Sequence, residues 1–92
     1  MAGGPSNAAL KKYVGANARR LRERVDLTQE EAATRVGVSP RYYRAIELGQ
    51  VNLTLVTLGL VADALGVQAH RLLRPTQAQH RGPGRPKKVF RR

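Results

Sequence analysis

The chain has 92 residues, enough for one compact domain, and it contains no cysteine, which excludes a disulfide framework and a thiolate metal site. Aromatic residues make up only 4% of it, so Leu, Val, Ala and Ile must build the core, a composition that suits a small all-α domain. Seventeen Lys and Arg against six Asp and Glu give a net charge of +11, which favours nucleic acid as a partner, with a solubilising surface as the alternative.

The excess charge is unevenly distributed. Residues 1–73 carry ten Lys and Arg against six Asp and Glu, and residues 74–92 carry seven against none. No apolar segment has the length of a signal peptide or membrane span, so we expect a cytoplasmic protein, associated with the nucleoid and without membrane contact. Because His70 and His80 lack neighbours at metal-ligand spacing and no catalytic motif occurs, we expect no enzyme activity, cofactor, metal or small-molecule ligand.

Five helices are predicted, preceded by a disordered leader over residues 1–8. Apolar residues recur every three to four positions after Ala9, which predicts the first helix over residues 9–24. Thr28 and Glu31 have the spacing of a capping box, in which each side chain pairs with an end N–H group of the helix. The second helix therefore begins there and ends near Gly37.

The third helix is predicted over residues 40–48, because Ser39 is a favourable N-cap and Pro40 is tolerated at the first helical position. Gly49 is expected to end it in a left-handed conformation. A fourth helix, capped by Thr54, is expected to end at Gly66.

A short fifth helix is predicted over residues 68–73, since Pro75 cannot continue a helix. These elements make one domain over residues 9–74. Residues 75–92 are rich in Gly, Pro, Arg and Lys, and we expect a flexible basic tail there.

A turn of about three residues around Gly37 and Val38 joins the second and third predicted helices, which is typical of a helix-turn-helix. An ordinary helical hairpin has the same turn, so the turn alone leaves both interpretations open.

A longer pattern resembles the Xre/Cro/C1 family of phage-type repressors over residues 14–73. The matching residues are Leu21-Arg22, Leu27-Thr28-Gln29-Glu30-Glu31, Ala33, Val36-Gly37-Val38-Ser39, Ile46-Glu47, Gly49, Asn52, Leu55, Thr57-Leu58 and Ala64-Leu65-Gly66-Val67. Ala32, Tyr43 and Leu53 depart from the usual Leu, Ile or Val, and Pro. The resemblance implies an all-α, five-helix, lambda-repressor-like helix-turn-helix domain.

The resemblance also implies that the helix over residues 40–48 enters the major groove of double-stranded DNA. The expected DNA-binding residues are Thr28, Gln29, Ser39, Pro40, Arg41, Tyr42, Arg44, Ala45, Gln50 and Asn52. Arg41 and Arg44 are the candidates for base contacts, because a guanidinium can donate two hydrogen bonds to guanine O6 and N7. Phosphate contact or solvent exposure is the alternative for Arg44, and a role in the turn is the alternative for Asn52.

Two further features follow from the resemblance and the spacing. Arg22 and Glu47 match a pair that implies a partly buried salt bridge between the first and third helices. Tyr43 shares the inward face of the third helix with Val38 and Ile46, so we expect it in the core.

The basic tail contains a segment, residues 81–88, that resembles an AT-hook, a short motif that binds the minor groove of A/T-rich DNA. The expected contact residues are Arg81, Gly84, Arg85, Pro86, Lys87 and Lys88. Pro83 stands where the usual hook has a second arginine, so a plain polycationic tail is the alternative.

These observations predict a sequence-specific, DNA-binding transcriptional regulator, more in keeping with a repressor than an activator. Related small regulators bind palindromic operators as homodimers, and Val67, Leu72 and Leu73 are the candidate interface, although the leucines can instead close the core. Two alternatives remain: a helix-turn-helix adaptor that binds a protein partner, and an architectural DNA-binding protein led by its basic tail.

Overall fold

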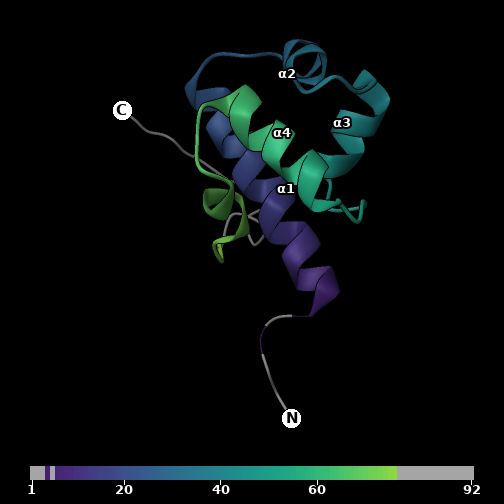
Figure 1. The fold of residues 1–92 in the computed structure, drawn as a ribbon, viewed down its shortest axis with the longest axis vertical. Helices are drawn as coiled ribbons and strands as arrows, with labels where there is room; N and C mark the ends of the chain where they lie inside the picture. Colours follow the sequence, from purple (N-terminus) through teal and green to yellow (C-terminus); the bar gives the residue numbers. More distant parts are fainter. Residues whose placement is uncertain (1–3, 5, 77–92) are drawn as a thin grey trace, which may run out of the picture.

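A side chain caps the first turn of each α-helix in the computed structural model. The structure describes residue 4 and residues 6–76, and this part of the chain contains four α-helices. The elements are α1 (Asn7–Arg24), α2 (Gln29–Val36), α3 (Pro40–Glu47), α4 (Leu55–Leu65) and a 3-10 helix, η1 (Ala69–Leu73) (Figure 1). Each α-helix begins where a hydroxyl accepts a hydrogen bond from a backbone N–H three residues later, and the hydroxyls are those of Ser6, Thr28, Ser39 and Thr54. No strand occurs in the described part of the chain, and none of its helices is long and apolar enough to cross a membrane.

The turn between α2 and α3 depends on a left-handed glycine. Gly37 has a φ of 93°, a conformation that strains residues with a side chain, and its N–H donates to the carbonyl oxygen of Ala33 at 2.8 Å. The N–H of Val38 donates to the same oxygen at 3.0 Å. Only Gly37, Val38 and Ser39 therefore separate the two helices, as the sequence predicts for a helix-turn-helix.

Two predicted elements differ from the structure. α1 begins at Asn7 rather than residue 9, because the Ser6 hydroxyl accepts the N–H of Ala9 at 3.1 Å and so provides an N-cap. The predicted fifth α-helix is wrong, since Ala69–Leu73 forms a 3-10 helix. Gln68 makes no side-chain cap to that helix, and the backbone returns to an extended conformation at Arg74.

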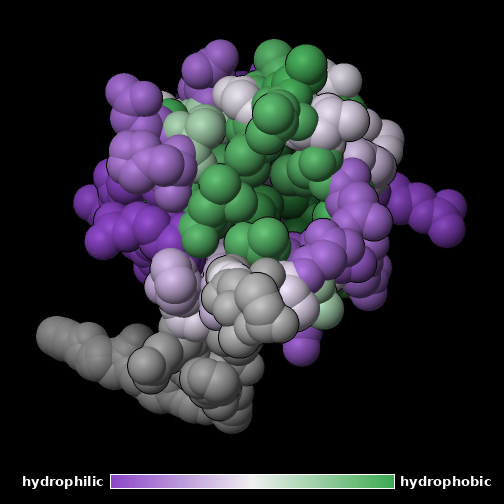
Figure 2. Space-filling view, turned by 60° about the horizontal axis from the view of Figure 1, so that its bottom comes forward, coloured by the Kyte–Doolittle hydropathy of each residue, from purple (hydrophilic) through white to green (hydrophobic). Residues whose placement is uncertain are grey.

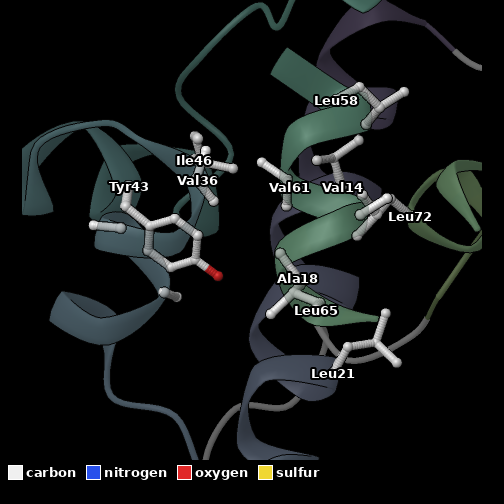
Figure 3. Close-up of a cluster of buried hydrophobic side chains, with 13 residues drawn as sticks. Val14, Ala18, Leu21, Val36, Tyr43, Ile46, Leu58, Val61, Leu65 and Leu72 are labelled. Carbon is white, nitrogen blue, oxygen red and sulfur yellow. The ribbon is translucent and has the colours of Figure 1, made fainter. Parts of the chain in front are cut away.

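The core lies where α1 and α4 meet the helix pair α2 and α3 (Figure 3). Its buried residues are Val14, Ala18, Leu21, Ala32, Ala33, Val36, Tyr43, Ile46, Leu58, Val61, Ala62, Leu65 and Leu72. Tyr43 is fully buried, so its predicted place in the core is confirmed. Leu72 is fully buried as well, so its predicted place in a dimer interface is wrong: its side chain closes the monomer core.

A buried asparagine fastens η1 to α1. The Asn17 amide donates to the carbonyl oxygens of Leu72 at 3.0 Å and Arg74 at 2.8 Å, and its oxygen accepts from Arg20 at 3.1 Å. Asn17 is only 1% exposed, so these bonds satisfy polar groups that water does not reach. The short η1 is thus held by side-chain hydrogen bonds in addition to apolar packing.

The helices α1 and α3 approach each other closely at Gly15. A Cβ atom at this position would lie 2.5 Å from the carbonyl oxygen of Glu47 and 2.6 Å from that of Ile46. Both atoms belong to the backbone, so neither can move without a shift of α3. Gly15 therefore sets the distance between α1 and the end of α3.

We predict that Gly15→Ala lowers the free energy of unfolding by about 1–3 kcal/mol, because the new methyl group forces α3 away from α1. Gly59→Ala is the matched control: Gly59 lies within α4, and a Cβ there meets no atom within 4 Å. This control should gain about 0.5–1 kcal/mol from lower backbone entropy in the unfolded chain. Urea unfolding followed by circular dichroism measures both changes, and equal effects of the two substitutions would contradict the close packing at Gly15.

Candidate nucleic-acid interface

The side of α3 that faces away from the core carries several of the residues predicted to bind DNA. Tyr43 and Ile46 are buried against the other helices. Ser39, Pro40, Arg41, Tyr42 and Arg44 are exposed, and Ala45 is half-buried. Because α3 presents basic and polar groups on one side and buries the other, its exposed side is available to a partner while the helix stays fixed.

The beginning of α2 leaves two backbone donors unpaired beside this surface. In the capping box, the N–H of Thr28 donates to the Glu31 carboxylate at 2.8 Å, and the N–H of Glu31 donates to the Thr28 hydroxyl at 3.0 Å. The N–H groups of Gln29 and Glu30 therefore remain free of protein partners in the described part of the chain. Free N–H groups and the positive end of a helix dipole suit a phosphate.

Glu47, the last residue of α3, joins three segments in a buried polar network. Its carboxylate accepts from Arg22 Nε at 2.6 Å and Nη2 at 3.1 Å, and from the Gln29 side-chain amide at 2.9 Å. Arg22 also donates to the carbonyl oxygen of Leu27 at 2.8 Å. The side chains of Arg22 and Glu47 are only 12% and 4% exposed, so the network is shielded from solvent. The hydrogen bond to Glu47 raises the pKa of Arg22, which keeps the guanidinium charged.

This network engages the side chain of Gln29, one of the residues predicted to bind DNA. Its amide bonds to Glu47 inside the domain. The group of Gln29 that remains free for an anion is its backbone N–H at the start of α2. The structure therefore brings Gln29 to the predicted surface, but with the backbone rather than the side chain turned to a ligand.

Arg41 and Arg44 differ in their surroundings. Arg41 is exposed and forms no ion pair with any residue that the structure describes. Arg44 Nη1 lies 3.6 Å from a carboxylate oxygen of Glu30 in the first turn of α2. The two arginines thus stand on the same side of α3, one free and one paired.

The loop after α3 holds Gln50 and Asn52, both exposed. The Asn52 side-chain oxygen accepts from the Asn7 amide at 2.8 Å, which ties the loop to the start of α1. Asn52 thus has a structural contact of the kind named as the alternative to DNA binding. Its exposure leaves the predicted contact with DNA sterically open.

Some predicted sites lie elsewhere. Arg81, Gly84, Arg85, Pro86, Lys87 and Lys88 lie outside the described residues, as do His80 and residues 1–3 and 5 of the predicted leader. Among the described residues, no group of three His, Cys, Asp or Glu side chains gathers as a metal site would require. Sequence reasoning missed Gly15, although an isolated glycine within a long helix pattern often marks close packing.

A second surface is apolar and lies over the first turns of α4 and the end of η1. Figure 2 shows an apolar area flanked on two sides by hydrophilic residues, in a view that brings the bottom of Figure 1 forward. Leu55 is 85% exposed, Val56 73%, Leu60 43% and Leu73 39%. We call these four residues the apolar face. Leu55 and Leu73 also line a groove of about 170 Å³ between α1, α4 and η1. Val67 is half-buried.

Comparisons with known proteins agree with this geometry. A helix-turn-helix family model, HTH_3, matches residues 19–72. An uncharacterized HTH-type transcriptional regulator, y4dJ, of Sinorhizobium fredii is 45% identical over 67 residues, which are 73% of this chain and 87% of the relative.

Two solved structures have a similar fold. The crystal structure of a hypothetical transcription factor from Neisseria superposes with a TM-score of 0.71 and 33% identity, covering 86% of this chain and 91% of that one. The restriction-modification controller protein C.AhdI of Aeromonas hydrophila has a TM-score of 0.65 and 32% identity, covering 67% and 94%.

The Tyr43 hydroxyl generates a prediction about alkaline pH. It is buried without a hydrogen-bond partner among the described residues. Burial, reinforced by the nearby negative charge of Glu47, raises its pKa well above the ordinary value of 10.0. The unfolded chain therefore loses this proton first, and the free energy of unfolding falls as the pH rises above 10.

We predict that the wild type loses about 1 kcal/mol more stability than Tyr43→Phe for the first pH unit above 10. The phenylalanine variant keeps the ring in the core and removes only the titrating group, so the other tyrosines and lysines affect both proteins equally. Urea unfolding at a series of pH values measures the difference. Parallel pH profiles for the two proteins would show that the hydroxyl is not shielded from solvent.

Proposed function

The chain belongs to the HTH_3 family of helix-turn-helix proteins, and we propose that it is a transcriptional regulator that binds a specific sequence in double-stranded DNA. The observation that carries this proposal is the exposed side of α3, where Arg41 and Arg44 project from a helix whose other side is fixed to α1 and α2. A rigid helix with exposed arginines suits the major groove, where base edges are distinguishable.

Base recognition is assigned to Arg41 and Arg44. Arg41 has no ion pair among the described residues, so no protein contact must break before it meets a base. Each arginine can donate two hydrogen bonds to O6 and N7 of a guanine. We therefore expect guanines in the operator at the positions that face these two residues.

Phosphate contacts are assigned to the residues around α3. The free N–H groups of Gln29 and Glu30 at the start of α2 suit one phosphate. Four polar side chains on α3 or in the segments before and after it are exposed and add donors for the DNA backbone: those of Thr28, Tyr42, Gln50 and Asn52. Residues 81–88 are proposed to add minor-groove or phosphate contacts beside the core site.

We propose repression as the regulatory mode, because a small domain that occupies its operator is enough to exclude other proteins from that stretch of DNA. The names of its relatives support a regulatory role, since they include an HTH-type transcriptional regulator and a restriction-modification controller protein. An architectural role led by the tail is the second candidate, and it rests on the charge of +7 over residues 74–92.

We further propose that the protein is a homodimer that binds a palindromic operator, with half-sites about one helical turn apart. The support is the apolar face, whose leucines and valine are exposed on α4 and at the end of η1 and carry no charge. Burying such residues against an identical face removes apolar surface from water without bringing like charges together. Val67 lies at the edge of η1 and is expected at the margin of the contact.

The base contacts are tested by enriching a preferred duplex from a randomised library with the full chain and then measuring the binding of variants. Arg41→Ala and Arg44→Ala should each weaken binding to the preferred duplex by about 1–3 kcal/mol and relax the choice of base at one position. Arg24→Ala, an exposed arginine at the end of α1, removes the same charge and should leave the preference unchanged. Retention of the full motif by both α3 variants would contradict the proposal, and strong binding without any motif would favour the architectural role.

The homodimer is tested by sedimentation of the wild type and of Leu55→Lys. The wild type should sediment as a dimer and the variant as a monomer, because a lysine at the most exposed residue of the apolar face places like charges across the two-fold axis. Val25→Lys is the matched control, since Val25 is an exposed apolar residue outside that face. A monomeric wild type, or equal dissociation by both variants, would rule out this interface.

A further inference from the structure

Glu30 places a negative charge on the surface proposed to meet DNA. Its carboxylate lies 3.6 Å from Arg44 Nη1, and the two side chains are 66% and 47% exposed. The neighbouring Glu31 carboxylate accepts the N–H of Thr28 in the capping box, so it is already engaged. Glu30 is therefore the acidic side chain of α2 that interacts with a proposed base-contacting residue.

The exposed pair restrains Arg44 only weakly. Ion pairs between exposed side chains change equilibrium constants by about fivefold or less. Two hydrogen bonds from one guanidinium to a guanine can contribute more binding free energy than this ion pair does. The correct base can therefore replace Glu30 as the partner of Arg44. The pair is therefore strong enough to bias where Arg44 points and weak enough to break in a specific complex.

The charge of Glu30 affects phosphate contacts of Arg44 differently from its base contacts. A phosphate that bonds to Arg44 comes close to the Glu30 carboxylate, and the two negative charges repel each other. The edge of a guanine has no net charge, so its approach to Arg44 meets no such repulsion. The carboxylate thus penalises the contact that is common to all DNA sequences and tolerates the contact that depends on sequence.

We propose that Glu30 is a specificity-determining residue, which keeps Arg44 from phosphates on non-specific DNA and releases it to a guanine in the operator. The inference rests on the proposed function, because it assigns a second role to the same surface. Glu30 acts through Arg44, so it is a positioning residue rather than a base-contacting one.

The test compares Glu30→Gln with the wild type on a duplex of random sequence, by fluorescence anisotropy at several salt concentrations. The variant should bind this duplex about three- to fivefold more tightly. The slope of log affinity against log salt should become steeper by about 0.9, the value for one additional phosphate contact. Affinity for the enriched duplex should change less, so the ratio of specific to non-specific affinity falls.

Glu23→Gln is the matched control. Glu23 forms an exposed ion pair with Arg19 at 3.3 Å on α1, so its substitution removes the same charge and breaks a similar pair away from α3. If Glu23→Gln tightens non-specific binding as much as Glu30→Gln does, net charge explains the effect and the proposal is overturned. Equal thermal unfolding of the variants shows that the fold is unchanged.

The dependence on Arg44 is tested by adding Glu30→Gln to an Arg44→Ala background. The gain in non-specific binding should disappear there, because no guanidinium remains to be released. A gain that persists shows that Glu30 repels DNA directly, which contradicts its positioning role. The measurements on random-sequence DNA need no enriched motif, so they test whether Glu30 keeps Arg44 from phosphates even if the wild type enriches no motif and the proposed regulator is wrong.

Discussion

The orientation of α3 depends on the contact between its last turn and α1. Glu47 is buried there against Arg22 and Gln29, and the backbone of Ile46 and Glu47 rests on Gly15. A buried carboxylate that lost either partner would leave an uncompensated charge, so the network has one favourable arrangement. The glycine fixes the distance between the helices, and the ion pair fixes the angle at which α3 leaves the core.

The two ion pairs of α3 have opposite roles because their exposure differs. The Arg22–Glu47 pair is shielded from water, and its carboxylate accepts from two nitrogens of Arg22 and one of Gln29. This pair therefore holds α3 in place. Glu30–Arg44 is exposed and longer, so it can exchange one partner for another at little cost. The domain thus combines a rigidly held helix with exposed side chains that can change partners, and the rigidity of the helix lowers the entropy lost on binding.

Local signals in the sequence predict much of this fold. The capping residues, the turn at Gly37 and the inward place of Tyr43 follow from rules that involve only neighbours along the chain. The 3-10 form of η1 does not follow from such rules, and neither does the choice of Leu72 for the core, because η1 is bonded to Asn17, which lies 55 residues before Leu72 in the chain. At the site, the residue types predicted the exposed arginines. The hydrogen bond between Gln29 and Glu47 and the ion pair between Glu30 and Arg44 could not be predicted, because each joins two residues that are distant in sequence.

The most direct test of the central claim is a titration of isotope-labelled protein with its enriched duplex, monitored through backbone amide resonances. If the rigidly held α3 and the start of α2 form the DNA-binding surface, the largest changes should fall at Gln29, Glu30 and Arg41, with little change at Arg19 and Glu23 on α1. Changes concentrated on the apolar face or on α1, with α3 unaffected, would contradict the account.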